Sequence, residues 1–242
     1  MINRRDLGIK IFADGAQLEE MKRVYEEGLV DGFTTNPYFL MLAGVSDYEM
    51  FASEVLAAIP DLPISFEVIS DDFESIEKEA RVVSSWGDNV YVKIPVTNSK
   101  GESSAELIRQ LSGEGMKLNI TAIYTPAQVE TVVQVLSQDS PSVISVFAGR
   151  IGETGVDPMP IVKQAAAMIR EQPLPHAELL WASTREVYNI FQAQECGCHI
   201  ITMAQDILHK LNSIGTPLEQ VSRDTVKYFY DCAVKSRLKI IQ

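Results

Sequence analysis

The stretch NVYVKIPVT, residues 89–97, decides the fold, because it places a lysine inside a run that is otherwise typical of a buried β-strand. Its valines, tyrosine and isoleucine favour strands, and a proline and a threonine close the run. Side chains alternate between the two faces of a strand, so Lys93 shares a face with Tyr91 and Pro95, opposite the aliphatic residues. The aliphatic face suits contact with covering helices. Lys93 is therefore predicted to point into the interior of the sheet, where lysine is rarely found without a partner.

Apolar runs of the same kind recur along the 242 residues, and a helical pattern follows each of them. The strands predicted in addition to residues 89–96 are 9–14, 31–36, 63–69, 117–124, 142–149, 177–183 and 199–203. The predicted helices are 16–27, 47–59, 71–86, 103–112, 126–136, 158–171, 185–195, 205–211 and 218–239. This alternation indicates an α/β protein, a single (β/α)8 TIM barrel, in one domain spanning residues 1–242.

An open, doubly wound sheet is the alternative fold for the same alternation. Such a sheet normally carries a glycine fingerprint after its first strand, and FADGAQLEE, residues 12–20, lacks one. We therefore expect the barrel, with residues 218–239 as a long C-terminal helix. That helix is amphipathic enough to pack over the barrel mouth or against another subunit, which leaves a homo-oligomer open.

The composition limits the class of function. The chain has 33 acidic residues against 21 basic ones, and its net charge of −12 argues against nonspecific binding to nucleic acid or an anionic membrane. A local basic pocket for a small anion remains compatible with this charge. No window approaches the apolar length of a transmembrane helix, and the first 14 residues lack the long apolar region of a signal peptide.

Three cysteines form an odd, sparse set that fits a reducing cytoplasm rather than a disulfide framework. The run CGCH, residues 196–199, invites a metal-site interpretation. A helix end with a glycine cap, followed by a strand, explains the run equally simply. Because the chain has three histidines and no second ligand cluster, we expect the helix end and no metal.

Polar residues interrupt the predicted strands near their carboxyl ends, where barrel enzymes carry their reactive groups. They are Asp14, Asn36, Glu67, Lys93, Asn119, Thr121, Ser145 and Ser183. Burial makes a charged ammonium costly and so favours the free amine of Lys93, the nucleophile that Schiff-base chemistry with a carbonyl substrate needs. Asp14 and Glu67 could pair with the lysine or move protons. The alternative is a buried Lys–Glu pair with a structural role alone.

A second group of residues follows the sixth and seventh predicted strands, in FAGRIG (147–152) and WASTRE (181–186). Arg150, Ser183 and Arg185 could bind a phosphate together with a helix N-terminus. Alternatively, both arginines are solvated or paired with acidic neighbours such as Glu153 and Glu186. The residues alone leave these two interpretations open.

The sequence resembles the transaldolase family, including the related fructose-6-phosphate aldolases, along nearly the whole chain. The motifs that carry the resemblance are ADGAQLEEMK (13–22), GFTTNP (32–37), YVKIPVT (91–97), LNITAIYTPAQ (118–128), SVFAGRIG (145–152) and WASTRE (181–186). It implies a barrel enzyme of the Schiff-base type that acts on sugar phosphates without a metal or other cofactor.

The resemblance also implies a role for each matching residue. Lys93 matches the Schiff-base lysine, Asp14 the acid–base residue, and Glu67 with Thr121 the pair that positions a water. Asn36, Asn119 and Ser145 match groups that hold the dihydroxyacetone unit, and Thr34 and Phe147 belong to the same substrate-binding motifs. Arg150, Ser183 and Arg185 match the phosphate site.

Within the family, Glu67, Asn119 and Phe147 resemble the transaldolase type more than the aldolase type. We therefore expect transfer of dihydroxyacetone from a donor like fructose 6-phosphate to an acceptor like erythrose 4-phosphate. An aldolase and a non-catalytic sugar-phosphate-binding barrel are the alternatives. The chain departs from the family pattern at Gly15, Gly152 and Thr184, which leaves the acceptor and the pathway open.

Overall fold

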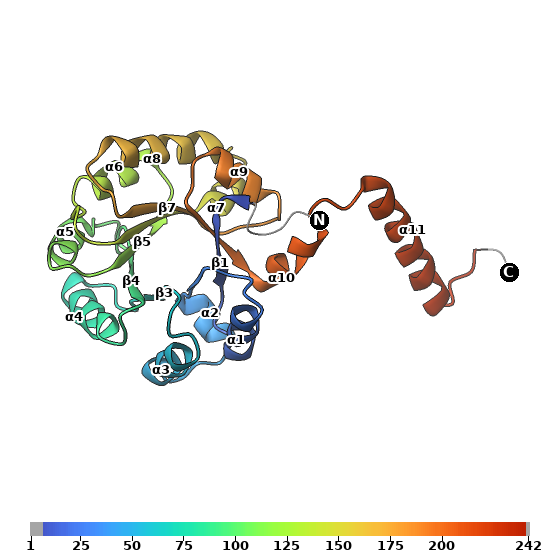
Figure 1. Cartoon of the computed structure of the whole chain (residues 1–242), viewed down its shortest axis with the longest axis horizontal. Helices are drawn as coiled ribbons and strands as arrows, with labels where there is room; N and C mark the ends of the chain where they lie inside the picture. The colour runs from blue at the N-terminus through green and yellow to red at the C-terminus, as the bar shows by residue number, and fades with distance from the viewer. Residues whose placement is uncertain (1–6, 241–242) are drawn as a thin grey trace.

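The computed structural model describes residues 7–240; residues 1–6 and 241–242 of the predicted domain lie outside the described residues. Within that range, eight parallel strands pair in chain order, and the eighth closes on the first (Figure 1). They are β1 Lys10–Asp14, β2 Gly32–Thr34, β3 Ile64–Glu67, β4 Val90–Pro95, β5 Leu118–Ile123, β6 Ser142–Val146, β7 Ala177–Trp181 and β8 Ile200–Ala204. The predicted (β/α)8 barrel is confirmed.

Helices surround this barrel. In chain order they are α1 Leu18–Glu26, α2 Pro37–Leu42, α3 Tyr48–Ala58, α4 Phe73–Ser84, α5 Ala105–Gly113, α6 Pro126–Val133, α7 Ala148–Glu153, α8 Met159–Glu171, α9 Asn189–Glu195, α10 Gln205–Leu208 and α11 Leu218–Lys235, with a 3-10 helix at His209–Ser213. In CGCH, α9 ends at Glu195 and Gly197 has φ +84°, which confirms the predicted helix end.

The sequence did not predict the short helices α2 and α7. The side chain of Asn36 accepts a hydrogen bond from the backbone N–H of Phe39, and Pro37 follows it, so α2 starts directly after a strand that is shorter than expected. The helix predicted at 185–195 starts four residues late. The side chain of Asn189 accepts hydrogen bonds from the backbone N–H groups of Arg185 and Glu186, which closes a turn ahead of α9.

The two faces of β4 lie in different parts of the core. Val92 and Ile94 are fully buried in the layer between strands and helices, whereas Tyr91 packs against an apolar cluster inside the barrel. That cluster consists of Phe12, Val143, Leu180, Ala182 and Ile200. Because Lys93 is two residues from Tyr91, it points into the barrel interior above the cluster, as predicted.

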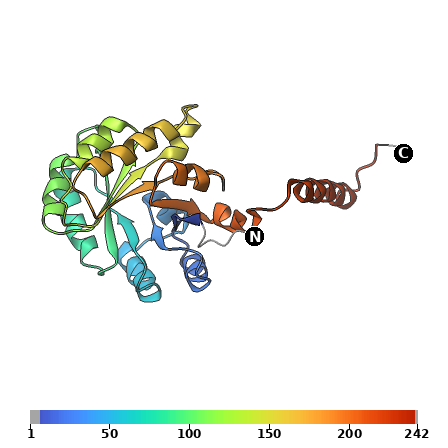
Figure 2. The same ribbon diagram turned by 45° about the horizontal axis from the view of Figure 1, so that its top comes forward.

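The last helix, α11, projects away from the barrel in both views (Figure 1, Figure 2). None of its described residues, Leu218–Lys235, is buried, and it ends four residues earlier than expected. The alternative in which this helix covers the barrel mouth of its own chain is therefore wrong for this structure. Among residues 7–240 no helix is long and apolar enough to cross a bilayer.

Candidate active site

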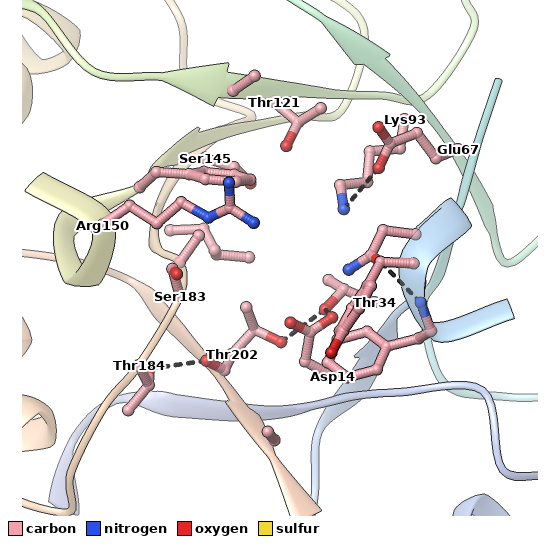
Figure 3. A pocket seen from close by; sticks show the side chains of 18 of the residues that line it. Asp14, Thr34, Glu67, Lys93, Thr121, Ser145, Arg150, Ser183, Thr184 and Thr202 are labelled. Carbon is pink, nitrogen blue, oxygen red and sulfur yellow. Dashed lines mark hydrogen bonds and ion pairs between the residues drawn. The ribbon is translucent and has the colours of Figure 1, made fainter. Parts of the chain in front are cut away.

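A cavity of about 590 Å³ opens at the carboxyl ends of the strands (Figure 3). The residues predicted for the site that line it are Asp14, Thr34, Asn36, Glu67, Lys93, Thr121, Ser145, Phe147, Arg150, Ser183 and Arg185. Asn119, the remaining predicted residue, is fully buried and hydrogen-bonded to Ser145. Barrel closure therefore brings together side chains that are spread over most of the chain.

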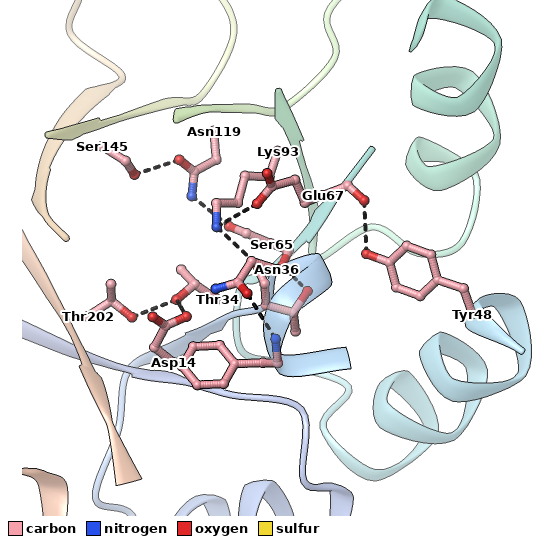
Figure 4. A network of polar contacts seen from close by, with 12 residues as sticks. Asp14, Thr34, Asn36, Tyr48, Ser65, Glu67, Lys93, Asn119, Ser145 and Thr202 are labelled. Atoms are coloured by element: carbon pink, nitrogen blue, oxygen red, sulfur yellow. Dashed lines mark hydrogen bonds and ion pairs between the residues drawn. The ribbon is translucent and has the colours of Figure 1, made fainter. Parts of the chain in front are cut away.

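Lys93 lines the cavity with a side chain that is only 6% exposed, and two oxygen atoms hold its amine. Its Nζ lies 2.9 Å from Oε2 of Glu67 and donates a hydrogen bond of 2.9 Å to the backbone carbonyl of Thr35 (Figure 4). Glu67 and Lys93 are register partners on β3 and β4, so both side chains project to the same side of the sheet. A carboxylate thus stands within proton-transfer distance of the amine.

Asp14 lies across the cavity from this pair, at the end of β1. Its Oδ1 accepts a hydrogen bond of 2.8 Å from Oγ1 of Thr34, which lies 2.6 Å from Oγ1 of Thr202. Burial raises the pKa of the Asp14 carboxyl above its usual value, although the charge of Lys93 and the hydrogen bond from Thr34 oppose the rise. The cavity thus holds a carboxyl group that keeps a proton more readily than an aspartate in water.

A chain of polar groups lies beneath Lys93. Ser145 Oγ donates to Asn119 Oδ1 at 2.7 Å, and Asn119 Nδ2 donates to Ser65 Oγ at 2.9 Å. By contrast, Thr121 Oγ1 is buried at the cavity wall and has no hydrogen-bond partner among the described residues. A buried hydroxyl without a partner is unfavourable, so a ligand or water in the cavity could satisfy it.

The predicted phosphate residues gather at the cavity mouth. The guanidinium of Arg185 forms an ion pair of 2.7 Å with Glu153, so the alternative pairing is confirmed for this arginine. Arg150 instead lies over the ring of Phe147, with 5.9 Å between the guanidinium carbon and the ring centroid. Ser183 has φ +64°, a strained conformation for a residue other than glycine, and it turns the chain sharply after β7.

Several residues of the site were not predicted. Thr202 is a polar residue within the eighth apolar run, so the signal that identified the other site residues applies to it as well. Thr35 contributes a backbone carbonyl, for which the sequence offers no signal. The hydroxyl of Tyr48, on α3 outside the barrel, donates a hydrogen bond of 3.1 Å to the backbone carbonyl of Glu67. In the part of the chain that the structure describes, no group of three or more His, Cys, Asp or Glu residues is arranged to hold a metal ion.

Comparison with known proteins identifies the family. Residues 11–236 match the family described as Transaldolase/Fructose-6-phosphate aldolase. A probable transaldolase 2 from Listeria monocytogenes is 35% identical over 203 residues, which cover 84% of this chain and 88% of that protein. A probable transaldolase from Nitrosopumilus maritimus is 30% identical over 224 residues, with coverage of 90% and 96%.

Solved structures support the fold alone. Dihydrodipicolinate synthase from Rhodopseudomonas palustris superposes with a TM-score of 0.61 at 13% identity, covering 95% of this chain and 81% of that one. KGPDC from Streptococcus mutans gives a TM-score of 0.57 at 10% identity, with coverage of 86% and 92%. Since the sequence match covers nearly the whole barrel, the chain belongs to the transaldolase/fructose-6-phosphate aldolase family.

Proposed function

We propose that the protein is a transaldolase, a transferase of aldehyde or ketone residues that works through a Schiff base on Lys93. It moves a dihydroxyacetone unit from a ketose phosphate like fructose 6-phosphate to an aldose phosphate like erythrose 4-phosphate. The observation that carries the proposal is the buried Nζ of Lys93 in the cavity wall, 2.9 Å from the carboxylate of Glu67. A Lys–Glu pair with a structural role alone would not need a polar cavity in front of it.

Formation of the Schiff base begins with loss of a proton from the Lys93 ammonium, for which the Glu67 carboxylate is the nearest acceptor. The free amine attacks the ketose carbonyl, and the resulting carbinolamine loses water to give an iminium. The leaving hydroxyl needs a proton and the departing water needs a binding site. Glu67 and the unpaired hydroxyl of Thr121 would supply both.

Carbon–carbon cleavage then requires a base at the C4 hydroxyl, and we assign it to Asp14. Asp14 removes that proton, the C3–C4 bond breaks, its electrons move to the iminium, and an enamine forms while an aldose phosphate leaves. The raised pKa of Asp14 suits a group that takes up a proton and later returns it to the acceptor aldehyde. Thr34 orients this carboxylate through its hydrogen bond.

The remaining predicted residues bind the substrate in this proposal. Asn36 and Ser145 hold the hydroxyl groups of the dihydroxyacetone unit, and Phe147 bounds the cavity beside them. Asn119, which is buried, supports this site through its hydrogen bond with Ser145. Arg150, Ser183 and Arg185 bind the phosphate at the mouth of the same cavity. The negative net charge argues against nucleic acid or membranes as partners, and the sparse cysteines support a cytoplasmic location.

Borohydride trapping tests the Schiff base. The protein is incubated with fructose 6-phosphate, reduced, and analysed by intact mass and peptide mapping. We expect one adduct on the peptide that contains Lys93, no adduct in Lys93→Met, and an unchanged adduct in Lys100→Met, which removes an exposed lysine. Methionine fills a similar volume without an amine, so Lys93→Met should keep the fold. An unmodified Lys93 would refute the mechanism for this donor.

Aldolase activity is the second candidate, because the matched family includes fructose-6-phosphate aldolases. The two reactions share the enamine and differ in its fate, since an aldolase protonates and hydrolyses it while a transaldolase passes it to an aldehyde. Release of free dihydroxyacetone, compared with transfer to erythrose 4-phosphate, distinguishes them. A barrel that binds sugar phosphates without catalysis would show neither reaction and no adduct.

A further inference from the structure

The mouth of the cavity carries two arginines and one glutamate, which are Arg150, Arg185 and Glu153. Glu153 is the last residue of α7, and Arg185 lies in the turn between β7 and α9. The carboxylate of Glu153 binds Arg185 through both of its oxygens, since Nε of Arg185 donates to Oε1 at 2.7 Å and Nη2 donates to Oε2 at 2.9 Å. This parallel pair of hydrogen bonds is also the geometry in which a guanidinium binds two phosphate oxygens.

The opposite edge of Arg185 is anchored to the backbone. Its Nη1 donates to the carbonyl of Ser183 at 2.9 Å and to that of Thr184 at 3.3 Å. A Cβ atom on Gly149 would lie 1.6 Å from the carbonyl oxygen of Ser183, so α7 and the turn after β7 are in close contact there. Four of the five N–H groups of Arg185 are therefore engaged, and Glu153 occupies the edge that faces away from the backbone.

Arg150 differs from Arg185, because no carboxylate is paired with it among residues 7–240. Its guanidinium lies over the ring of Phe147, and its charge also acts on Glu153. The hydrogen bonds from Arg185, with a smaller contribution from Arg150, lower the pKa of the Glu153 carboxyl, so this group is ionised at neutral pH. The three residues together carry one net positive charge, and a phosphate dianion would meet one open guanidinium and one that is occupied.

We propose that Glu153 is a specificity residue that competes with the substrate phosphate for Arg185. This inference rests on the proposed function, since it concerns how tightly that same site binds the substrate phosphate. The side chains of Arg185 and Glu153 are 44% and 55% exposed, so the pair is screened by solvent and exchanges readily. Glu153 thus lowers the affinity for phosphorylated substrates and leaves the mouth accessible.

The experiment measures binding of inorganic phosphate by calorimetry at constant ionic strength, with wild type, Glu153→Gln and Glu153→Ala. Removal of the competing charge is expected to tighten phosphate binding about three- to tenfold, in keeping with the strength of an exposed ion pair. Glu195→Gln is the matched control, because it breaks an exposed ion pair of 2.6 Å with Lys163 that does not line the cavity. Its phosphate affinity should equal that of wild type.

Unchanged phosphate affinity in both Glu153 variants would overturn the inference. Weaker affinity would overturn it as well, because Glu153 would then be orienting Arg185 for phosphate rather than competing with it. Trapping of wild type with dihydroxyacetone, which has no phosphate, tests the proposed function separately. An adduct on Lys93 together with unchanged phosphate affinity in the Glu153 variants would refute the role of Glu153 alone. The absence of any adduct would refute the Schiff-base function.

Discussion

Asp14 is a carboxylate in surroundings that disfavour its charge, so its ionisation should lower the free energy of unfolding in a measurable way. Because burial raises its pKa in the folded protein, the folded state binds the proton more tightly than the unfolded chain. The stability contributed by the protonated form is fully present at a pH below 3.8, the usual pKa of the unfolded chain. It is lost as the pH rises through the raised pKa of the folded state. Each unit of the rise corresponds to about 1.4 kcal/mol at neutral pH.

Asp14→Asn should therefore unfold at higher denaturant concentration than wild type at pH 7, with a difference that shrinks as the pH falls toward 4. The asparagine oxygen can still accept the hydrogen bond from Thr34, so the fold should be kept. Transfer activity should fall at least about 100-fold, because the proposed base is lost. A variant that is less stable than wild type at pH 7 would contradict the conclusion that burial of the charged Asp14 destabilises the fold.

At the same scale, the orientation of Lys93 could be predicted, because alternation along β4 depends on the strand alone. The same argument extends to Asp14 and Glu67, whose positions at strand ends follow once the barrel is recognised. The contacts that hold Lys93 could be predicted only in part. Glu67 was an expected partner, but the carbonyl of Thr35 belongs to the backbone of an unpredicted turn. The sequence also leaves open whether Arg185 is paired, since that depends on α7, a short helix that the sequence pattern does not predict.

Helix α7 lies very close to the turn that follows β7, and this contact demands a glycine. A methyl group on Gly149 would lie 1.6 Å from the backbone oxygen of Ser183. Gly149→Ala should therefore destabilise the protein by about 1–3 kcal/mol and weaken phosphate binding, because the turn that carries Ser183 and Arg185 must move. Denaturant unfolding and phosphate calorimetry measure the two effects.

Gly152→Ala is the control for this prediction, since it makes the same substitution three residues later in α7. A methyl group there meets no atom within 4 Å, and alanine favours helix over glycine by roughly 1 kcal/mol. This variant should be as stable as wild type or more so. Equal losses in both variants would show that helix disruption, not the close approach to Ser183, is responsible.

Helix α3 supports the site from outside the barrel through Tyr48. Its hydroxyl donates to the backbone carbonyl of Glu67, and its ring packs edge-on against Trp86, with ring centroids 5.3 Å apart. Tyr48→Phe removes the hydroxyl alone and should cost about 0.5–1.5 kcal/mol of stability. It should also slow trapping of Lys93 by a few fold, because the main chain at Glu67 loses a restraint. An unchanged trapping rate would limit Tyr48 to packing.

At the scale of the whole molecule, the alternation of strands and helices was sufficient to predict the closed barrel, because the order of parallel strands follows the chain. The place of α11 could not be predicted in the same way. An amphipathic pattern shows that a helix needs an apolar contact, and it does not show which surface provides one. The amphipathic pattern is compatible with the barrel mouth of the same chain or with another subunit, and in this structure α11 does not pack against its own barrel (Figure 1).

We propose that α11 packs against another copy of the chain in a homo-oligomer. Leu218, Val221 and Phe229 recur at helical spacing on one face and are 79%, 45% and 65% exposed. Most of the stability of a helix in a protein comes from packing of such an apolar face. Phe229→Glu should therefore lower the molar mass measured by light scattering, whereas Gln220→Glu adds the same charge to the opposite, polar face and should leave it unchanged. A wild-type protein with the molar mass of one chain, 26.9 kDa, would exclude this use of the helix. The apolar face of α11 would then require a partner other than this chain, because exposure of several large apolar side chains on one helix is costly for a free monomer.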